Sequence, residues 1–210
     1  MGKVALGCIA VLVLVVLIVG ISMAGTYNRL VGLSQEVDKQ WSQVENQYQR
    51  RADLVPNLVA TVKGAAEFEK STLEAVVQAR ASVGRAQINT TSAPTDPAQL
   101  AQYEQAQAQL GAALQRLLLV VERYPELKAN QNFRDLQAQL EGTENRIAVE
   151  RMRYNEAAQA YNTSRLRFPT NLMANLLGFK EKAYFKATPG AERPPAVQFD
   201  FRNATPAPSR

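Results

Sequence analysis

The stretch FRDLQAQLEGTENRIAVERMRYNEAAQAYNTSRLRF, residues 133–168, carries an apolar residue at every seventh position. These positions are Phe133, Leu140, Ile147, Tyr154, Tyr161 and Phe168. A sustained seven-residue repeat keeps one face of a helix turned towards neighbouring helices. The repeat therefore predicts one long helix whose apolar stripe lies in the core of a bundle, and it does not indicate a cofactor site.

Three further helical stretches precede this one. Apolar residues recur every three or four positions over residues 27–52, 53–83 and 97–124. Asp53 and Asp96 have the residue type of a helix cap and each is followed by a proline in the first turn, while NTTSAPTDP, residues 89–97, has the composition of a linker. Four amphipathic helices with mostly short connections predict an all-α fold, an antiparallel up-down-up-down four-helix bundle with long helices.

An unbroken apolar run from Val4 to Ile21, extended by Met23 and Ala24, opens the chain. About 20 such residues cross a hydrocarbon core of about 30 Å as a helix. We therefore predict an N-terminal transmembrane helix, a signal-anchor over residues 1–25 that continues without a breaker into the first bundle helix. Residues 26–187 then form the bundle with a C-terminal capping segment, and residues 188–210 form a mostly disordered tail rich in Pro and Ala.

Two other interpretations of the apolar run are a cleaved secretory signal and a lipid-attached cysteine. The run is longer than the usual signal core of about 7 to 15 residues. Cys8 precedes most of the run, whereas a lipidated cysteine would follow it. The positive-inside count is close to a tie, with Lys3 and the terminal amine on one side and Arg29 and Lys39 on the other. The signal-like start of the chain leans slightly to a helical domain outside the cytoplasm.

The composition removes most catalytic constellations, because the chain has no histidine and only one cysteine, which lies in the apolar run. Ser-His-Asp and Cys-His pairs and histidine- or cysteine-based zinc sites all need those side chains. We expect no enzyme activity, no cofactor and no metal. The alternative is a carboxylate-based or cation-dependent enzyme, which would require at least two of Glu69, Glu141, Glu144 and Glu150 to converge on one pocket.

Charged residues interrupt the apolar stripes at a few positions. Because charge inside a bundle is costly unless it is paired, Glu69 or Glu144 with Arg80 or Arg151 is a candidate polar layer. The other interpretation is that the bundle is narrow and these side chains lie at its wet boundary.

The C-terminal part of the chain is basic. Residues 1–164 hold 16 Lys and Arg and 16 Asp and Glu, so the formal net charge of +5 arises from residues 165–210. This part mixes cations with apolar residues, as membrane-surface segments do. The candidate membrane or partner contacts are Arg165, Arg167, Phe179, Lys180, Lys182 and Lys186. The competing interpretation, which the domain division above adopts, is that residues 169–185 fold back as a short helix and cap the open end of the bundle. The basic residues form no dense run, so the sequence does not predict nucleic-acid binding. Within the tail, residues 197–201 are a candidate for a short strand.

Long ordered motifs cover most of the soluble part. They include YNRLVGLSQEVDKQWSQVENQYQRRADLVPNLVATVKG from Tyr27, YPELKANQNFRDLQAQLEGTENRIAVERMRYNEAAQAYN from Tyr124 and FPTNLMANLLGF from Phe168. These motifs resemble the LemA family. The resemblance implies a bacterial single-span membrane protein with a four-helix bundle and no established enzymatic activity, associated with membrane organisation and in some bacteria with a membrane metalloprotease of the HtpX type. Phe68 stands where the family often has histidine, so a shared function does not need imidazole there.

The predicted function is that of a membrane-anchored, non-enzymatic scaffold or adaptor at the bacterial inner membrane. It would self-associate as a homo-oligomer, organise a membrane protein partner, or do both. Side-by-side packing of long rods would produce the homo-oligomer, and Arg50, Arg51 and Asp53 would help to orient the interacting surface.

Overall fold

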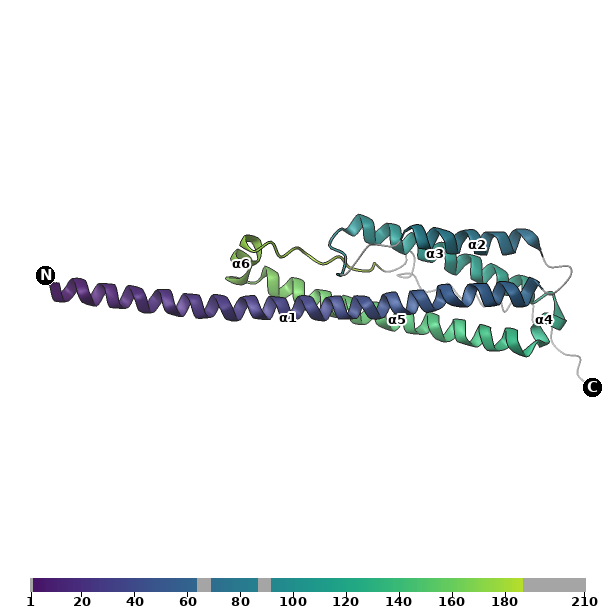
Figure 1. The fold of residues 1–210 in the computed structure, drawn as a ribbon, viewed down its shortest axis with the longest axis horizontal. Coiled ribbons are helices and arrows are strands. Elements are labelled where there is room, and N and C mark those ends of the chain that lie inside the picture. Colours follow the sequence, from purple (N-terminus) through teal and green to yellow (C-terminus); the bar gives the residue numbers. More distant parts are fainter. Residues whose placement is uncertain (1, 64–68, 87–91, 187–210) are drawn as a thin grey trace, which may run out of the picture.

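The computed structural model describes residues 2–63, 69–86 and 92–186, and the regular elements among them are helices. Its elements are α1 (Gly2–Lys63), α2 (Lys70–Arg85), α3 (Pro97–Val121), α4 (Pro125–Ala129), α5 (Gln131–Leu166) and α6 (Thr170–Leu176), as Figure 1 shows. The predicted tail and the strand considered at residues 197–201 lie outside the described residues.

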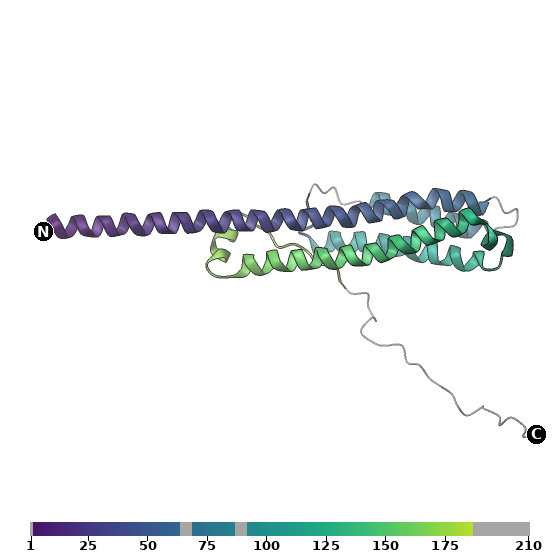
Figure 2. The same cartoon turned by 90° about the horizontal axis from the view of Figure 1, so that it is seen from below.

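The long helices form two antiparallel pairs, α1 with α5 and α2 with α3. The chain runs up α1, down α2, up α3 and down α5, and the short α4 turns the chain between α3 and α5 (Figure 2). The predicted cap at Asp96 is confirmed, because its side chain accepts a hydrogen bond from the Ala98 backbone N–H at 2.8 Å. The predicted all-α fold, with an apolar helix followed by an antiparallel bundle, is confirmed.

The boundary predicted between the first two bundle helices at Ala52 and Asp53 is wrong. Helix α1 continues through Pro56 to Lys63 and α2 begins only at Lys70. Proline lacks the N–H that would bond the carbonyl four residues earlier, so it usually breaks or kinks a helix interior. Here that carbonyl, on Ala52, accepts a hydrogen bond from Nε of Arg80 at 3.0 Å, and this replaces the missing partner.

The core has two halves along the bundle axis. The half nearer the apolar N-terminal part of α1 is aromatic and is centred on Trp41, whose ring lies 5.6 Å from that of Tyr154 and 5.9 Å from that of Phe185. The far half is aliphatic, with Leu58, Leu110 and neighbouring leucines and valines. The heptad residues of α5 from Phe133 to Tyr161 are buried in these two halves as predicted.

The two helix pairs have unequal lengths, and this decides how the aromatic half is covered. At about 1.5 Å per residue, α5 is about 54 Å long and α3 about 38 Å. An extended segment, residues 179–186, runs along the part of α5 that α3 does not reach, and we call it the C-terminal strap (Figure 1). Phe185 in this strap completes the aromatic core.

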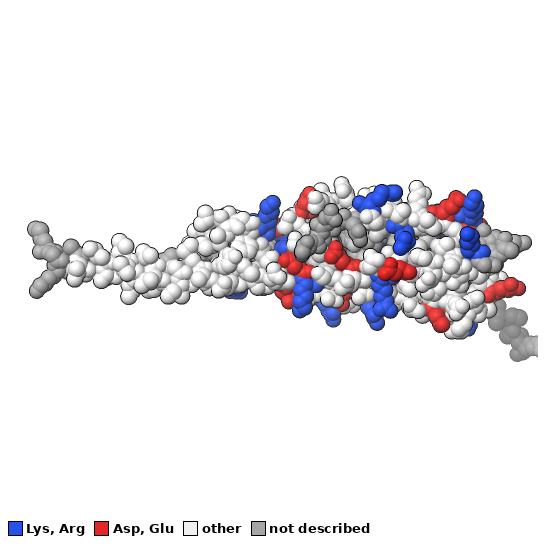
Figure 3. Space-filling view, viewed as in Figure 1, with Lys and Arg blue, Asp and Glu red and all other residues white. Residues whose placement is uncertain are grey.

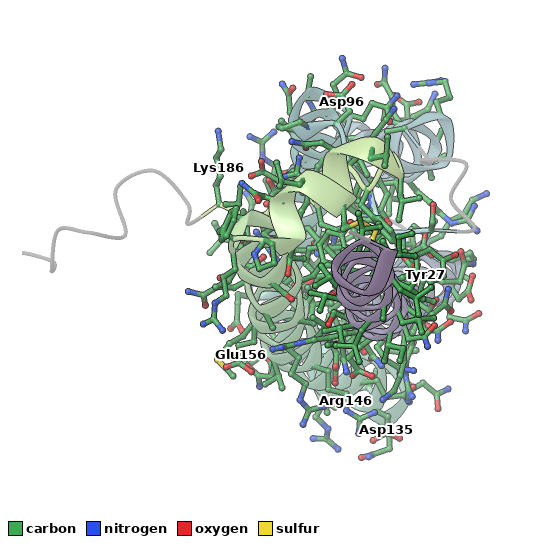
Figure 4. The ribbon with its side chains drawn as sticks, turned by 90° about the vertical axis from the view of Figure 1, so that its left-hand side faces the viewer. Tyr27, Asp96, Asp135, Arg146, Glu156 and Lys186 are labelled. Atoms are coloured by element: carbon green, nitrogen blue, oxygen red, sulfur yellow. The ribbon has the colours of Figure 1, made fainter. Side chains whose placement is uncertain are left out.

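The heptad prediction is wrong at its last position. Helix α5 ends at Leu166, and Phe168 is 80% exposed instead of lying in the core. The cause is Pro169, because a residue that precedes proline is driven out of the helical conformation. The chain then turns into α6, which lies across the end of the bundle beside α1, as Figure 4 shows from the N-terminal side.

Candidate functional site

A buried arginine separates the two halves of the core. The Arg51 side chain, 5% exposed, extends from α1 and donates hydrogen bonds to the backbone and side-chain oxygens of Gln107 on α3 at 3.0 and 2.5 Å. Its other terminal nitrogen donates to Glu144 on α5 at 2.8 Å. Three helices therefore meet at one polar layer, and its cation is not one of the two predicted.

Glu144, a predicted member of the polar layer, does lie in it. Arg151, two turns further along α5, instead pairs with Glu104 of α3 and lies over the ring of Phe185 at 4.6 Å. The Arg151–Glu104 pair holds α3 against α5 directly, whereas Arg51 links the two helices from α1 by bonding Gln107 and Glu144; the backbones of α3 and α5 approach less closely than those within the two helix pairs.

The other two predicted members lie away from this layer, so the pairing predicted for them is wrong. Glu69 precedes α2 and pairs at 2.7 Å with Arg123, which follows α3, at the far end of the bundle. Arg80 bonds the Ala52 carbonyl. Their partners are backbone or distant side chains that the periodicity of a single helix cannot identify.

Burial changes the proton affinity of groups around the layer. It raises the pKa of the Glu104 carboxyl, and the nearby Arg151 offsets only part of that rise. Burial also raises the pKa of the phenols of Tyr48, Tyr103 and Tyr154. A raised pKa stabilises the fold at pH values below the ordinary pKa and withdraws that stability as the pH rises through the shifted value.

A groove of about 420 Å³ lies between α3 and α5, beside the polar layer. Glu141 and Glu144 both line it, so two of the four carboxylates considered for an enzyme share a groove, and Glu144 is held by Arg51. Glu150 pairs with Arg153, and Glu69 is far away. Within residues 2–63, 69–86 and 92–186, no group of three or more Asp, Glu, His or Cys could hold a metal ion.

The C-terminal strap is held by a ladder of side chains on α5. Asn162 bonds both the N–H and the carbonyl of Lys182, at 3.0 and 2.9 Å. Asn155 does the same for Phe185, at 2.9 Å for both bonds. The hydroxyl of Tyr154 donates to the Ala183 carbonyl at 2.8 Å. Side chains of α5 thus bond most of the backbone polar groups from Lys182 to Phe185, while the Ala183 N–H bonds the Pro94 carbonyl at 3.0 Å.

The spacing of this ladder follows from backbone geometry. Asn155 and Asn162 are seven helical residues apart, a rise of about 10.5 Å. Their partners Phe185 and Lys182 are three extended residues apart, which span about 10 Å. Two tyrosines repeat this spacing. Tyr161 donates to the Lys180 carbonyl at 2.9 Å, and Tyr154, seven residues earlier on α5, donates to the carbonyl of Ala183, three residues later in the strap. Seven residues of a helix therefore advance as far as three residues of an extended chain, so side chains one heptad apart reach every third residue of the strap.

A buried ion pair fixes the strap to α1. Lys182 donates to Asp38 at 2.9 Å, and the two side chains are 7% and 18% exposed. The same carboxylate oxygen accepts the backbone N–H of Ala93, at 2.8 Å. The prediction that Lys182 contacts a membrane is wrong, because the folded-back strap buries its charge against Asp38.

The other predicted membrane or partner contacts differ in their exposure. Arg165 is half-buried and its Nε donates to the carbonyl of the partly buried Phe179 at 2.8 Å. Arg167, Lys180 and Lys186 are exposed. The prediction that residues 169–185 fold back and cap the open end of the bundle agrees with this arrangement.

Sequence reasoning missed the residues that position the strap. Asp38 and the two asparagines were not singled out, and Arg51 was expected at the surface. One signal was present in the sequence, because the stretch that forms α5 holds Tyr-Asn twice with a spacing of seven, at residues 154–155 and 161–162. An asparagine beside each core tyrosine indicates a backbone partner next to the apolar stripe.

Helix α1 is, among the described residues, the one helix long and apolar enough to cross a membrane. Its most apolar window of 18 residues has a mean hydropathy of 2.7 and is not buried against the bundle. The projecting part of α1 is white in Figure 3, while the charged side chains lie over the bundle. These features define a class: an all-helical bundle protein whose first helix carries an apolar segment suited to membrane anchoring.

Comparison with known proteins gives the family within that class. The model of the LemA family matches residues 40–199, and the chain belongs to this family. Magnetosome protein MamQ 2 of Paramagnetospirillum magneticum is 31% identical over 205 residues, covering 90% of this chain and 75% of the relative. Magnetosome protein MamQ of Magnetospirillum gryphiswaldense is 28% identical, covering 94% and 78%. Protein LemA of Metamycoplasma hominis is 24% identical, covering 78% and 70%.

Proposed function

We propose that this protein is a membrane-anchored, non-enzymatic scaffold that holds a helical bundle in a fixed position at the bacterial inner membrane. It self-associates, organises a membrane protein partner, or does both. The observation that carries the proposal is the continuity of α1, which runs from the apolar segment into the far half of the core without a break.

This continuity couples the bundle to its anchor. At about 1.5 Å per residue, α1 is about 93 Å long, and about 30 Å of it suffices to span a hydrocarbon core. The remainder contributes buried residues to both core halves, among them Trp41 and Leu58. The bundle cannot turn independently of the anchor unless this core opens, and a rigid connection suits a protein that positions others.

The names of two relatives support a structural role. Each is called a magnetosome protein, a name that attaches it to a cell structure and not to a reaction. We extend this to the present chain as part of the proposal. Two further parts of the proposal are a partner of the HtpX metalloprotease type, which rests on the family resemblance, and the placement of the bundle outside the cytoplasm, which rests on the signal-like start of the chain.

The experiment that tests the proposal measures the mass and the composition of the full-length protein in its own membrane. The protein is extracted into lipid nanodiscs with a polymer, sized by mass photometry, and its co-purifying proteins are identified by mass spectrometry. A discrete homo-oligomer, or one partner in constant ratio, is expected. A monomer without a stoichiometric partner would contradict the scaffold proposal.

A matched pair of variants tests the rival enzymatic function in the same preparation. Glu144→Gln removes the charge that Arg51 binds, and Glu141→Gln alters the adjacent carboxylate in the groove. If the protein is a scaffold, both variants keep the mass and partners of the wild type. A hydrolytic activity of the pure protein that disappears in both folded variants would favour the enzyme instead.

A further inference from the structure

We propose that the end of the bundle formed by residues 166–177, here called the α6 cap, inserts its apolar side chains into the same lipid bilayer that α1 spans. This inference rests on the proposed membrane anchoring and adds a second point of lipid contact. The bundle would then stand directly on the membrane surface and not above it on a stalk.

The position of the α6 cap along α1 is the first argument. Helix α6 packs against α1, and just after it the ring of Phe179 lies 5.9 Å from that of Tyr27 in an edge-on arrangement. Tyr27 comes three residues after the apolar run ends at Ala24, a rise of about 4.5 Å. The cap therefore lies at the level where an anchored α1 leaves the hydrocarbon, and tyrosine is enriched at that interface.

The surface of the cap is the second argument. Its exposed apolar side chains are Leu166, Phe168, Leu172, Leu176 and Leu177, of which Phe168 is 80% and Leu176 77% exposed. Phe168, Leu172 and Leu176 are spaced by four residues, while Ala174 on the other side of α6 is fully buried. Large apolar side chains gathered on one exposed surface mark an interaction site.

The distribution of charge is the third argument and favours lipid as the occupant. Residues 168–179, FPTNLMANLLGF, contain no charged side chain. Arg167 and Lys180 flank this segment and both are exposed. An uncharged apolar surface bordered by cations matches an acyl region below anionic headgroups. The end-on view of Figure 4 shows α6 facing the side from which the anchor of α1 projects.

The test measures the depth of spin labels in the full-length protein reconstituted into nanodiscs of phosphatidylethanolamine and phosphatidylglycerol. Cys8, the one cysteine, is replaced by serine, and a nitroxide is placed by Leu172→Cys in the cap. Two matched labels come from Leu14→Cys in the apolar run and Met152→Cys, an exposed apolar site on α5. Collision with oxygen reports lipid, and collision with a water-soluble nickel chelate reports water.

The expected result is that the label at position 172 collides more often with oxygen and several-fold less often with the nickel chelate than the label at position 152. The double variant Leu172→Cys with Leu176→Glu, checked for wild-type helicity, should lose much of that difference. A label at position 172 that behaves like the one at 152 overturns the proposal. Reduced collision with both reagents also overturns it, because protein and not lipid then covers the cap.

The label at position 14 separates this inference from the proposed function. If it reports lipid while position 172 reports water, the anchor stands and only the contact of the α6 cap fails. If position 14 reports water, the membrane anchoring itself fails.

Discussion

Removal of one asparagine side chain should release the C-terminal strap without unfolding the bundle. The change is Asn162→Ala. Asn162 is 4% exposed, and its amide is bonded to both polar groups of the Lys182 backbone. In the variant these two groups remain buried without a side-chain partner for as long as the strap stays in place.

The cost follows from these two bonds. A buried backbone group that loses its partner costs about 1 to 3 kcal/mol, so the pair costs about 2 to 6 kcal/mol. The strap can avoid this cost by opening to water, which means that the loss falls on local opening and not on global unfolding. At about 1.4 kcal/mol for each factor of ten, opening should become about 30- to 20,000-fold more frequent.

Hydrogen exchange followed by mass spectrometry on the full-length protein in detergent measures this opening. Peptides covering residues 179–186 should exchange faster by that factor, because the N–H groups of Lys182 and Ala183 are bonded in the closed strap. Peptides from α2 should keep their wild-type rates. The matched control is Asn145→Ala, the same substitution at an exposed position of α5, which should leave the strap protected.

Two results would refute this reasoning. If the strap of the Asn162→Ala variant exchanged at the wild-type rate, the asparagine ladder would not hold it. If α2 and the strap exchanged faster together, the strap would be part of one cooperative core and could not open alone.

Three further outcomes are expected of the full-length protein. Arg80→Ala should lower the free energy of unfolding, measured with urea, by about 1 kcal/mol. In a Pro56→Ala background it should lower it by almost nothing, because the new N–H at position 56 bonds the Ala52 carbonyl. If the two substitutions had additive effects, Arg80 would not be replacing the bond that Pro56 cannot make. Arg51→Ala should lower the free energy of unfolding by about 2 to 4 kcal/mol and Arg51→Met by clearly less, because both remove the cation that Gln107 and Glu144 bind but only methionine fills the space it leaves; equal losses would contradict this. Because the chain has no histidine, the melting temperature should change little around neutral pH. Because burial raises the pKa of several tyrosines, it should fall above about pH 10, where the phenols of the unfolded chain ionise. Tyr103→Phe should reduce that fall, and an unchanged fall would show that other groups cause it.

The helices were predictable because their signal is local. The heptad of α5 and the stripes of α1 and α3 state which faces are apolar, and burial of those faces is the main force that assembles a bundle. The boundary after Ala52 was wrong because Pro56 is a strong local signal for a helix start. Only Arg80, 28 residues from Ala52 in sequence, compensates for the proline.

The polar contacts were less predictable for the same reason. Glu144 was recognised as a break in an apolar stripe, but its partner Arg51 lies 93 residues away on another helix. Lys182 looked like a surface cation because its partner Asp38 lies 144 residues away. A long flexible side chain can reach several neighbours, and periodicity within one helix does not say which neighbour is present.

The sequence by itself determined the all-helical class, the apolar N-terminal segment, the seam of α5 and membership of the LemA family. Each of these depends on residues that are close in sequence, where the rise and turn of a helix fix which side chains share a face. The tertiary structure alone decided that α1 passes through Pro56, that Arg51 divides the core, and that the strap buries Lys182 while the α6 cap exposes Phe168 and its neighbours. The first two outcomes depend on partners far away in sequence, Arg80 for the Ala52 carbonyl and Gln107 and Glu144 for Arg51. The strap and the cap depend on the unequal lengths of the two helix pairs, because the shortfall of α3 leaves an apolar face of α5 that the returning C-terminal segment covers.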